Sequence, residues 1–187
     1  MIFESSPALK KGIAGVLEVS GDDVKILDAA RLQSTLIDDL VATAGIPNVG
    51  ALSAFRSGTS VTADKWTNTV PSWTATGLAA AKTNADEIRT AVAANGRAAV
   101  AFRAPDGSGG TDLVVVAYDG AAWASPVTKN VPAASGGVGH IALAIHSNGD
   151  PLLVWTQGFD VLSGRLRVAT NTFDANVPVE TGKADAI

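Results

Sequence analysis

The strongest constraint on how this chain can fold is an internal repeat. The segment Asn95–Phe102 (Asn-Gly-Arg-Ala-Ala-Val-Ala-Phe) aligns without a gap on Asn148–Trp155 (Asn-Gly-Asp-Pro-Leu-Leu-Val-Trp), at a spacing of 53 residues. An apolar, alternating run precedes each Asn-Gly dipeptide, Ile88–Val92 in one copy and Ile141–Ile145 in the other. A repeat of this length indicates a fold assembled from copies of one small supersecondary unit.

Each copy reads as a series of short β-strands. Asn-Gly tolerates positive φ at both central positions, so it predicts a two-residue hairpin turn between the first two strands. An aromatic-Asp pair, Tyr118-Asp119 or Phe173-Asp174, is expected where the third strand ends. The predicted third and fourth strands are Leu113–Tyr118 and Ala122–Val127 in one copy, and Arg165–Thr170 and Asn176–Val179 in the other.

A looser third copy precedes these two. Ala54-Phe55-Arg56 repeats as Ala101-Phe102-Arg103, at a shorter spacing of 47 residues. Strand-like runs at Ser60–Thr67 and Ser72–Ala75 then lead to Ile88, in the order seen in the later copies. The sequence therefore predicts repeated four-stranded antiparallel units over residues 51–187 and a mainly β fold.

Four short strands per unit resemble the blades of β-propellers, of the kelch or sialidase-like kind in general form. The resemblance covers about residues 50–180. The kelch pattern of a glycine pair with a following Tyr…Trp is absent, and the run from Tyr118 to Trp123 matches the sialidase Asp-box only when it is shifted by one residue, so no catalytic residue carries over. The alternative fold is a β-sandwich of similar hairpins. Propellers close with about four to eight blades, so a chain with two or three units either stops short of closure, closes by oligomerising, for example as a trimer with two blades per chain, or forms the sandwich instead.

The first fifty residues lack the repeat and are expected to form a separate strand-helix adaptor segment. Leu32, Leu36 and Leu40 recur at a spacing of four residues, with Asp28 suited to the N-cap and Gly45 to the position after the helix. This pattern predicts an amphipathic helix over residues 29–44. The helix either packs on a sheet edge or docks another subunit through those three leucines.

Composition restricts the function. Hydrophobic residues make up 47% and charged residues 17% of the 187, against roughly 25% charged in ordinary domains. The net charge is −4 and basic residues do not cluster, so nucleic acid is excluded as a partner. No apolar run reaches the length of a membrane span, and the N-terminal residues lack the apolar core of a signal peptide. We expect synthesis in the cytoplasm and a final place in a virion or extracellular assembly.

Motifs for catalysis or metal binding are not found. The chain has no cysteine, no Gly-x-Ser-x-Gly sequence and no P-loop. His140 and His146 stand at the two ends of one predicted strand, too far apart to share a metal ion. The loop Asp106–Asp112 faintly resembles a calcium loop but is interpreted as a flexible hairpin loop. These observations predict no enzyme activity, no metal and no cofactor.

Three tryptophans support an alternative function, glycan binding. Trp66, Trp73 and Trp123 lie on or near the outer strands of their units, where exposed indoles stack on sugar rings and buried ones fill the core. The hypothesis favoured by the low charge and the Ala, Gly, Thr and Val content is a non-enzymatic structural protein of a phage or phage-like virion, working as a homo-oligomer or with other subunits. The alternatives are a glycan-binding propeller-like lectin and, third, a glycoside hydrolase.

Overall fold

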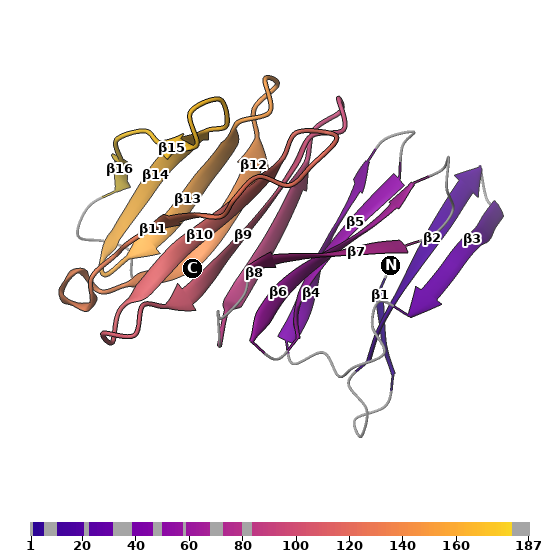
Figure 1. Cartoon of the computed structure of the whole chain (residues 1–187), viewed down its shortest axis with the longest axis horizontal. Helices are drawn as coiled ribbons and strands as arrows, with labels where there is room; N and C mark the ends of the chain where they lie inside the picture. The colour runs from indigo at the N-terminus through magenta and orange to yellow at the C-terminus, as the bar shows by residue number, and fades with distance from the viewer. Residues whose placement is uncertain are drawn as a thin grey trace.

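The chain folds into antiparallel β-sheets that follow one another along the long axis of the molecule (Figure 1). They are seen in a computed structural model of the whole chain. The structure describes the backbone of residues 2–5, 11–20, 23–31, 39–46, 50–57, 59–67, 73–79 and 84–180, and the side chains of residues 50–56, 59–65, 76–78 and 84–180.

Four sheets are formed by neighbouring strands in chain order. The N-terminal sheet comprises β1 (Ile2–Ser5), β2 (Lys11–Ser20) and β3 (Asp23–Arg31). The first repeat sheet comprises β4 (Asp39–Ile46), β5 (Gly50–Ser57), β6 (Ser60–Thr67) and β7 (Trp73–Ala79). The second repeat sheet comprises β8 (Asp86–Val92), β9 (Ala98–Pro105), β10 (Thr111–Tyr118) and β11 (Val127–Lys129). The third repeat sheet comprises β12 (Val138–Ile145), β13 (Pro151–Gln157), β14 (Asp160–Arg167), β15 (Thr172–Phe173) and β16 (Val177–Glu180).

The predicted mainly β fold with antiparallel sheets is confirmed, and the residues of the looser third copy lie in the first repeat sheet. Strand register shows the correspondence: Ala42 lies opposite Ala54, Arg89 opposite Ala101, and Ala142 opposite Val154. The division at residue 50 stays a prediction, although the first repeat sheet itself begins at β4 and so includes residues on both sides of it.

A β-bulge recurs near the start of the first strand in all three repeat sheets. The register shifts between Asp39 and Ala42, between Asp86 and Arg89, and again between Val138 and Ile141. One extra residue on the first strand produces each shift, and such bulges bend the strand and increase its twist. The first two bulges begin at equivalent Asp-Arg pairs, and the carboxylate of Asp86 accepts a hydrogen bond of 2.6 Å from Nη2 of Arg103.

The Asn-Gly turns are longer than the predicted two-residue turns. The N–H of Gly96 donates to the carbonyl of Ala93, and the N–H of Ala93 donates to the carbonyl of Arg97. Only the glycine has positive φ, +80° at Gly96 and +94° at Gly149. This is a β-turn followed by a left-handed glycine, the second commonest hairpin connection. The same bonds join residues 146, 149 and 150, so the two turns are alike in detail.

The predicted third strand of the last copy was misplaced. The strand β14 covers Asp160–Arg167 rather than Arg165–Thr170, and Phe173 belongs to β15. The aromatic-Asp pair of the last copy is therefore not equivalent to Tyr118-Asp119, because Phe173 lies at the position taken by Trp123 in the second sheet, which bridges to Tyr118. The predicted fourth run, Asn176–Val179, corresponds to β16.

The predicted helix over residues 29–44 is wrong at both ends. Strand β3 continues to Arg31 and β4 begins at Asp39, while residues 32–38, with Leu32 and Leu36, lie outside the described part of the chain. A spacing of four residues is also even, so it places side chains on one face of a strand as well as on one face of a helix. The pairing of β4 with β5 shows that residues 39–46 form a strand and not a helix.

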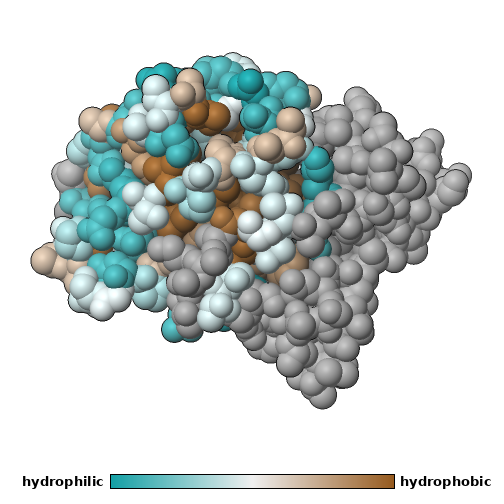
Figure 2. All heavy atoms as spheres, viewed as in Figure 1, coloured by the Kyte–Doolittle hydropathy of each residue, from teal (hydrophilic) through white to brown (hydrophobic). Residues whose placement is uncertain are grey.

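The core consists of two apolar clusters, one on each face of the second repeat sheet. Val100 and Val114 contact the first repeat sheet, whereas their strand neighbours Ala101 and Val115 contact the third. All four side chains are 0% exposed. A two-layer sandwich leaves each sheet one outward face, and the second repeat sheet has none. Figure 2 shows apolar residues at the centre of the coloured surface, surrounded by polar ones.

The opposite face of the first repeat sheet buries a polar pair. Ser53 on β5 lies directly opposite Asp64 on β6, and the two residues are 0% and 1% exposed. Neither the Ser53 hydroxyl nor Oδ1 of Asp64 has a hydrogen-bond partner. Burial raises the pKa of the Asp64 carboxyl to about 6, because the charged form loses its hydration.

We expect Asp64→Asn to stabilise the protein at pH 7.5 by about 3 kcal/mol, since the wild-type protein must bury a carboxylate above its raised pKa. In the unfolded chain this carboxyl ionises near 3.8, so the wild-type penalty grows between about pH 4 and pH 6 and the gain vanishes below pH 4. Urea unfolding across this pH range measures the difference. Glu180→Gln, at an exposed position, serves as the control. A gain independent of pH would contradict the burial of this charge.

Gly96→Ala is expected to cost about 1 kcal/mol in unfolding free energy, because alanine disfavours positive φ. Gly149→Ala should cost more, since a Cβ there would overlap the side chain of Arg97 and displace it from the carbonyl of Asn148. Gly77→Ala has open space and no positive φ, so it is the control and should have little effect. Equal costs at 96 and 149 would show that the contact between the turns is unimportant.

Candidate functional site

The third repeat sheet has an outer face that no described sheet covers. Along β13 exposure alternates: Leu153 and Trp155 are 1% exposed and pack toward the second repeat sheet, whereas Leu152 and Val154 are 36% and 39% exposed. Ser163 and Arg165 of β14 lie opposite Val154 and Leu152, so they share the outer face. This face carries two large apolar side chains where an ordinary edge sheet carries polar ones.

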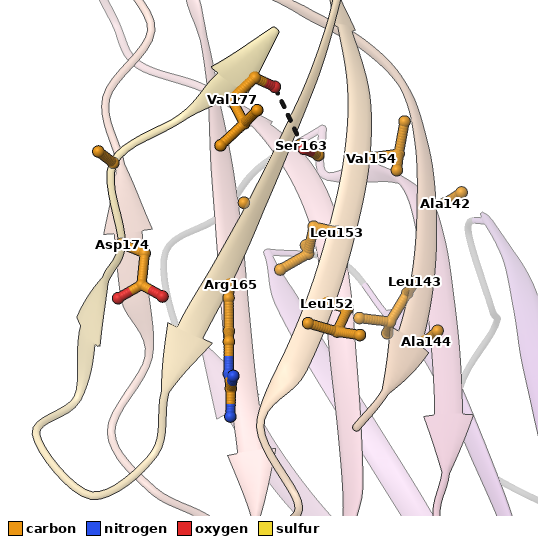
Figure 3. A pocket seen from close by; sticks show the side chains of 12 residues that line it. Ala142, Leu143, Ala144, Leu152, Leu153, Val154, Ser163, Arg165, Asp174 and Val177 are labelled. Atoms are coloured by element: carbon orange, nitrogen blue, oxygen red, sulfur yellow. Dashed lines mark hydrogen bonds between the residues drawn. The ribbon is translucent and has the colours of Figure 1, made fainter. Parts of the chain in front are cut away.

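A shallow groove of about 430 Å³ crosses this face. Figure 3 shows β12, β13 and β14 side by side along the groove, with the segment between β15 and β16 beyond β14. Val177, which is 59% exposed, lies beside Ser163 of β14, and its carbonyl accepts a hydrogen bond of 3.1 Å from the Ser163 hydroxyl. We call this feature the outer groove; its outward-facing lining is chiefly Ala142, Ala144, Leu152, Val154, Ala175 and Val177.

The polar end of the outer groove is held by Asp150. The Asp150 carboxylate, 6% exposed, receives hydrogen bonds from the N–H of Val168 at 2.9 Å, from Nδ2 of Asn148 at 3.0 Å and from Nε of Arg165 at 2.8 Å. Burial alone would raise its pKa, but these donors and the Arg165 charge outweigh burial and hold the pKa below 3.8. The turn between β12 and β13 is thereby joined to the end of β14.

The second charged pair at the rim is also satisfied within the sheet. Nη2 of Arg167 lies 2.8 Å from Oδ2 of Asp174, and their side chains are 46% and 38% exposed. With Arg165 paired to Asp150, both arginines near the outer groove have a carboxylate partner. The outer groove therefore presents an apolar floor and a rim whose charges are already neutralised.

The internal repeat relates the outer face of the third repeat sheet to a buried face of the second repeat sheet. Leu152 and Val154 occupy the positions of Ala99 and Ala101, 53 residues earlier. Both alanines are 0% exposed, and Ala101 packs in the cluster formed with the third repeat sheet. The outer face is thus the same face of the unit that elsewhere is covered by the following sheet.

A second side-chain cluster joins β8 to β12 at the bulges. Glu87 has φ +51°, unusual for a residue with a Cβ, and its carboxylate lies 2.6 Å from Nη2 of Arg89 and 3.4 Å from Nδ1 of His140. Nε of Arg89 donates to the carbonyl of Ile141 at 3.0 Å. The side chain of Arg89 and its neighbours border a smaller groove of about 260 Å³. Because Nε of Arg89 binds a carbonyl of β12 and the Glu87 carboxylate faces His140 of the same strand, the arrangement joins the two sheets.

The structure places the candidate tryptophans at one end of successive sheets. Trp66 lies opposite Trp73 in the first repeat sheet, and Trp123 lies opposite Tyr118 in the second. The rings of Tyr118 and Trp123 are 5.1 Å apart, Trp123 is half-buried, and Nζ of Lys65 lies 4.7 Å from the Tyr118 ring centre. The side chains of Trp66 and Trp73 lie outside the described residues, so glycan stacking by these three stays a prediction.

The candidate interface residues from the N-terminal segment were Leu32, Leu36 and Leu40. Only Leu40 falls in a described strand, β4, and its side chain is outside the description. Sequence reasoning missed Leu152 and Val154. The available signal was that the run Pro151–Trp155 is apolar at every position, which is typical of a strand covered on both faces.

The remaining candidates for metal binding are engaged in local structure. The Asp106 carboxylate accepts from the N–H and hydroxyl of Ser108 and from the N–H of Gly110, which fits the hairpin-loop interpretation. His146 contacts Asn148 within its turn, whereas His140 faces Glu87. Among the described residues, no group of three His, Asp or Glu side chains is placed to hold a metal ion.

Comparisons with known proteins do not assign the chain to a family. No protein-family model matches the sequence, and no curated protein matches it. No helix within the described part of the chain is long and apolar enough to cross a membrane.

Asp150→Asn is expected to lower the unfolding free energy by about 3 kcal/mol at pH 7, because it leaves Arg165 with a partly buried, unpaired charge. A group with a lowered pKa stabilises the fold above its unfolded pKa, so this difference should shrink as the pH falls through about 3.8 and below. Chemical unfolding at pH 7 and pH 3 measures it. Asp174→Asn, which breaks the exposed pair with Arg167, is the control and should cost much less.

Proposed function

We propose that this protein is a non-enzymatic structural subunit of a larger assembly, in which the repeat sheets act as blades of a propeller-like stack that partner subunits continue. The observation that carries this proposal is the outer groove. It belongs to the face that is buried wherever a sheet follows, and here it is open over Leu152 and Val154. The partners are other protein chains, and the contact is formed by apolar β surface.

Physical magnitudes support association through this face. Covering Leu152, Val154 and Val177, which are 36%, 39% and 59% exposed, removes apolar surface that is worth roughly 0.5 to 1.5 kcal/mol per side chain. The neutralised rim adds no large penalty for removing unpaired charge from water. Such a surface fits a lasting contact between subunits.

The kind of assembly is proposed from composition. A charged fraction of 17%, no cysteine and an abundance of small residues suit a protein that buries much of its surface against neighbours. A component of a phage or phage-like virion, or of another extracellular assembly, fits these features. Its partners then include copies of itself or other virion proteins.

Particles purified from cells that express the protein test this proposal. Mass spectrometry should find the chain in the particles at a fixed copy number relative to their other proteins. A Val154→Asp variant should be depleted from particles, because it places a charge on the outer face, whereas Phe159→Asp, at a 75% exposed turn position outside the groove, should be incorporated normally. Particles without the chain would contradict the proposal.

Glycan binding is the second candidate, and one observation favours it. Aromatic pairs recur at the same end of two successive sheets, Trp66 with Trp73 and Tyr118 with Trp123. Aromatic residues at one end of successive sheets suit stacking on sugar rings. The glycosidase alternative requires two carboxylates that flank one bond; the two grooves described above have Asp174 as their one lining carboxylate.

A glycan array separates the lectin from the structural subunit. The lectin hypothesis expects micromolar-to-millimolar binding that Trp123→Ala abolishes while the fold persists. The structural proposal expects no binding with either protein. Trp123→Phe serves as the control, because it keeps the packing against Tyr118 better than alanine does.

A further inference from the structure

We infer that Asn95 is a site of spontaneous covalent modification, at which the turn between β8 and β9 loses its side-chain amide, while the repeated turn at Asn148 is protected from the same reaction. The dipeptide Asn-Gly occurs twice in the chain, at Asn95-Gly96 and at Asn148-Gly149. Asparagine is among the least heat-stable residues, and a following glycine favours its conversion to aspartate. The reaction is independent of the proposed role as a subunit.

The chemistry needs only the chain and water. The backbone nitrogen of the glycine attacks Cγ of the asparagine and forms a five-membered succinimide ring. The Cγ–Nδ2 bond breaks, and Nδ2 leaves as ammonia with the proton of the glycine N–H. Water then opens the ring at either carbonyl, which gives an aspartate or an isoaspartate whose main chain runs through Cβ and Cγ. Glycine hinders the attack least, because it has no Cβ and adopts more backbone conformations than other residues.

The turn at Asn95 is open to this reaction. Asn95 is exposed and its two hydrogen bonds are long, since Nδ2 donates to the carbonyl of Ser147 at 3.4 Å and Oδ1 accepts from the N–H of Arg97 at 3.2 Å. Apart from its chain neighbours, no described residue lies within 4 Å of the point where Gly96 would carry a Cβ. A local opening that breaks the 3.0 Å bond from the Gly96 N–H to the Ala93 carbonyl therefore frees the reacting atoms to meet.

The turn at Asn148 has the same backbone bonds, but it is covered. Nδ2 of Asn148 donates to Oδ2 of Asp150 at 3.0 Å and Oδ1 accepts from the N–H of Asp150 at 3.1 Å, so the amide is held by a residue that is 6% exposed. Gly149 is buried, and the side chain of Arg97 lies against it and donates to the carbonyl of Asn148. Attack by the Gly149 nitrogen therefore requires both the Arg97 side chain and the Asp150 contacts to be displaced first.

The difference between the two turns comes from the stacking of the sheets. Arg97 belongs to the second repeat sheet and covers the turn of the third. In the first repeat sheet the equivalent position is Gly50, which has no side chain that could cover Gly96 in the same way. Conversion at Asn95 also alters the contact between sheets, because the carboxylate that replaces the amide has no N–H to donate to the carbonyl of Ser147.

Peptide mapping by mass spectrometry, after incubation of the full chain at mildly alkaline pH, tests the inference. Replacement of the amide NH2 by OH raises the mass of the affected peptide, and enzymatic methylation marks the isoaspartate product. We expect Asn95 to convert at least about tenfold faster than Asn148. Equal rates, a faster reaction at Asn148 or no reaction at either site would overturn the inference.

The denatured chain is the matched control. In guanidinium chloride the fold covers neither site, so the two rates should agree to within about threefold. A difference that persisted unchanged in the denatured chain would arise from the neighbouring sequence, and it would overturn protection by the fold.

Two variants test the cover over Gly149. Arg97→Ala should raise the rate at Asn148 at least about threefold and leave the rate at Asn95 unchanged, because it uncovers Gly149 and keeps the backbone N–H that binds Asn95. Arg89→Ala removes the other arginine bond to the third repeat sheet, at Ile141, and should leave the rate at Asn148 unchanged. An unchanged rate in Arg97→Ala, or an equal rise in both variants, would overturn the protective role of Arg97.

Discussion

Burial of both faces of the second repeat sheet is the constraint on which the rest of the structure depends. Val114 and Val116 contact one neighbouring sheet while Leu113 and Val115 contact the other, and all four are 0% exposed. A sheet buried on both faces needs a partner on each side, so it cannot fold without its neighbours. The third repeat sheet differs, because only one of its faces is buried in this way and Leu152 and Val154 on the other face are 36% and 39% exposed.

Polar contacts fix how neighbouring sheets are aligned, because apolar packing alone allows them to slide. Two flat apolar faces can slide past one another at little cost, whereas a hydrogen bond fixes one position. Arg89 and Arg97 supply such bonds at different places on the contact between the second and third repeat sheets. Within the third repeat sheet, Asp150 performs a similar role by joining the turn after β12 to β14. Stability and precise stacking thus come from different residues.

The repeat was readable from sequence because hairpin chemistry is local. The Asn-Gly turns, the apolar runs around them and the spacing of 53 residues all correspond to paired strands. The detailed turn geometry was not readable, because the same dipeptide fits a two-residue turn and a longer turn with a left-handed glycine. The predicted helix over residues 29–44 was wrong for a similar reason. The position of Leu40 fits the side-chain period of a helix and that of a strand, and the non-local pairing of β4 with β5 selects the strand. The outer groove was missed because the apolar run Pro151–Trp155 predicts a strand buried on both faces, whereas the exposure of Leu152 depends on non-local packing.

The bulges at the start of β4, β8 and β12 have a consequence for shape. Each adds a residue to one strand only, so the sheet coils rather than lying flat, and the increment is repeated at every unit. The three insertions lie at equivalent places, so each repeat sheet is bent at the same end of its first strand. A chain that carried the same units without the additional residue would have flatter sheets. The twist of the stack is therefore tied to three single-residue insertions.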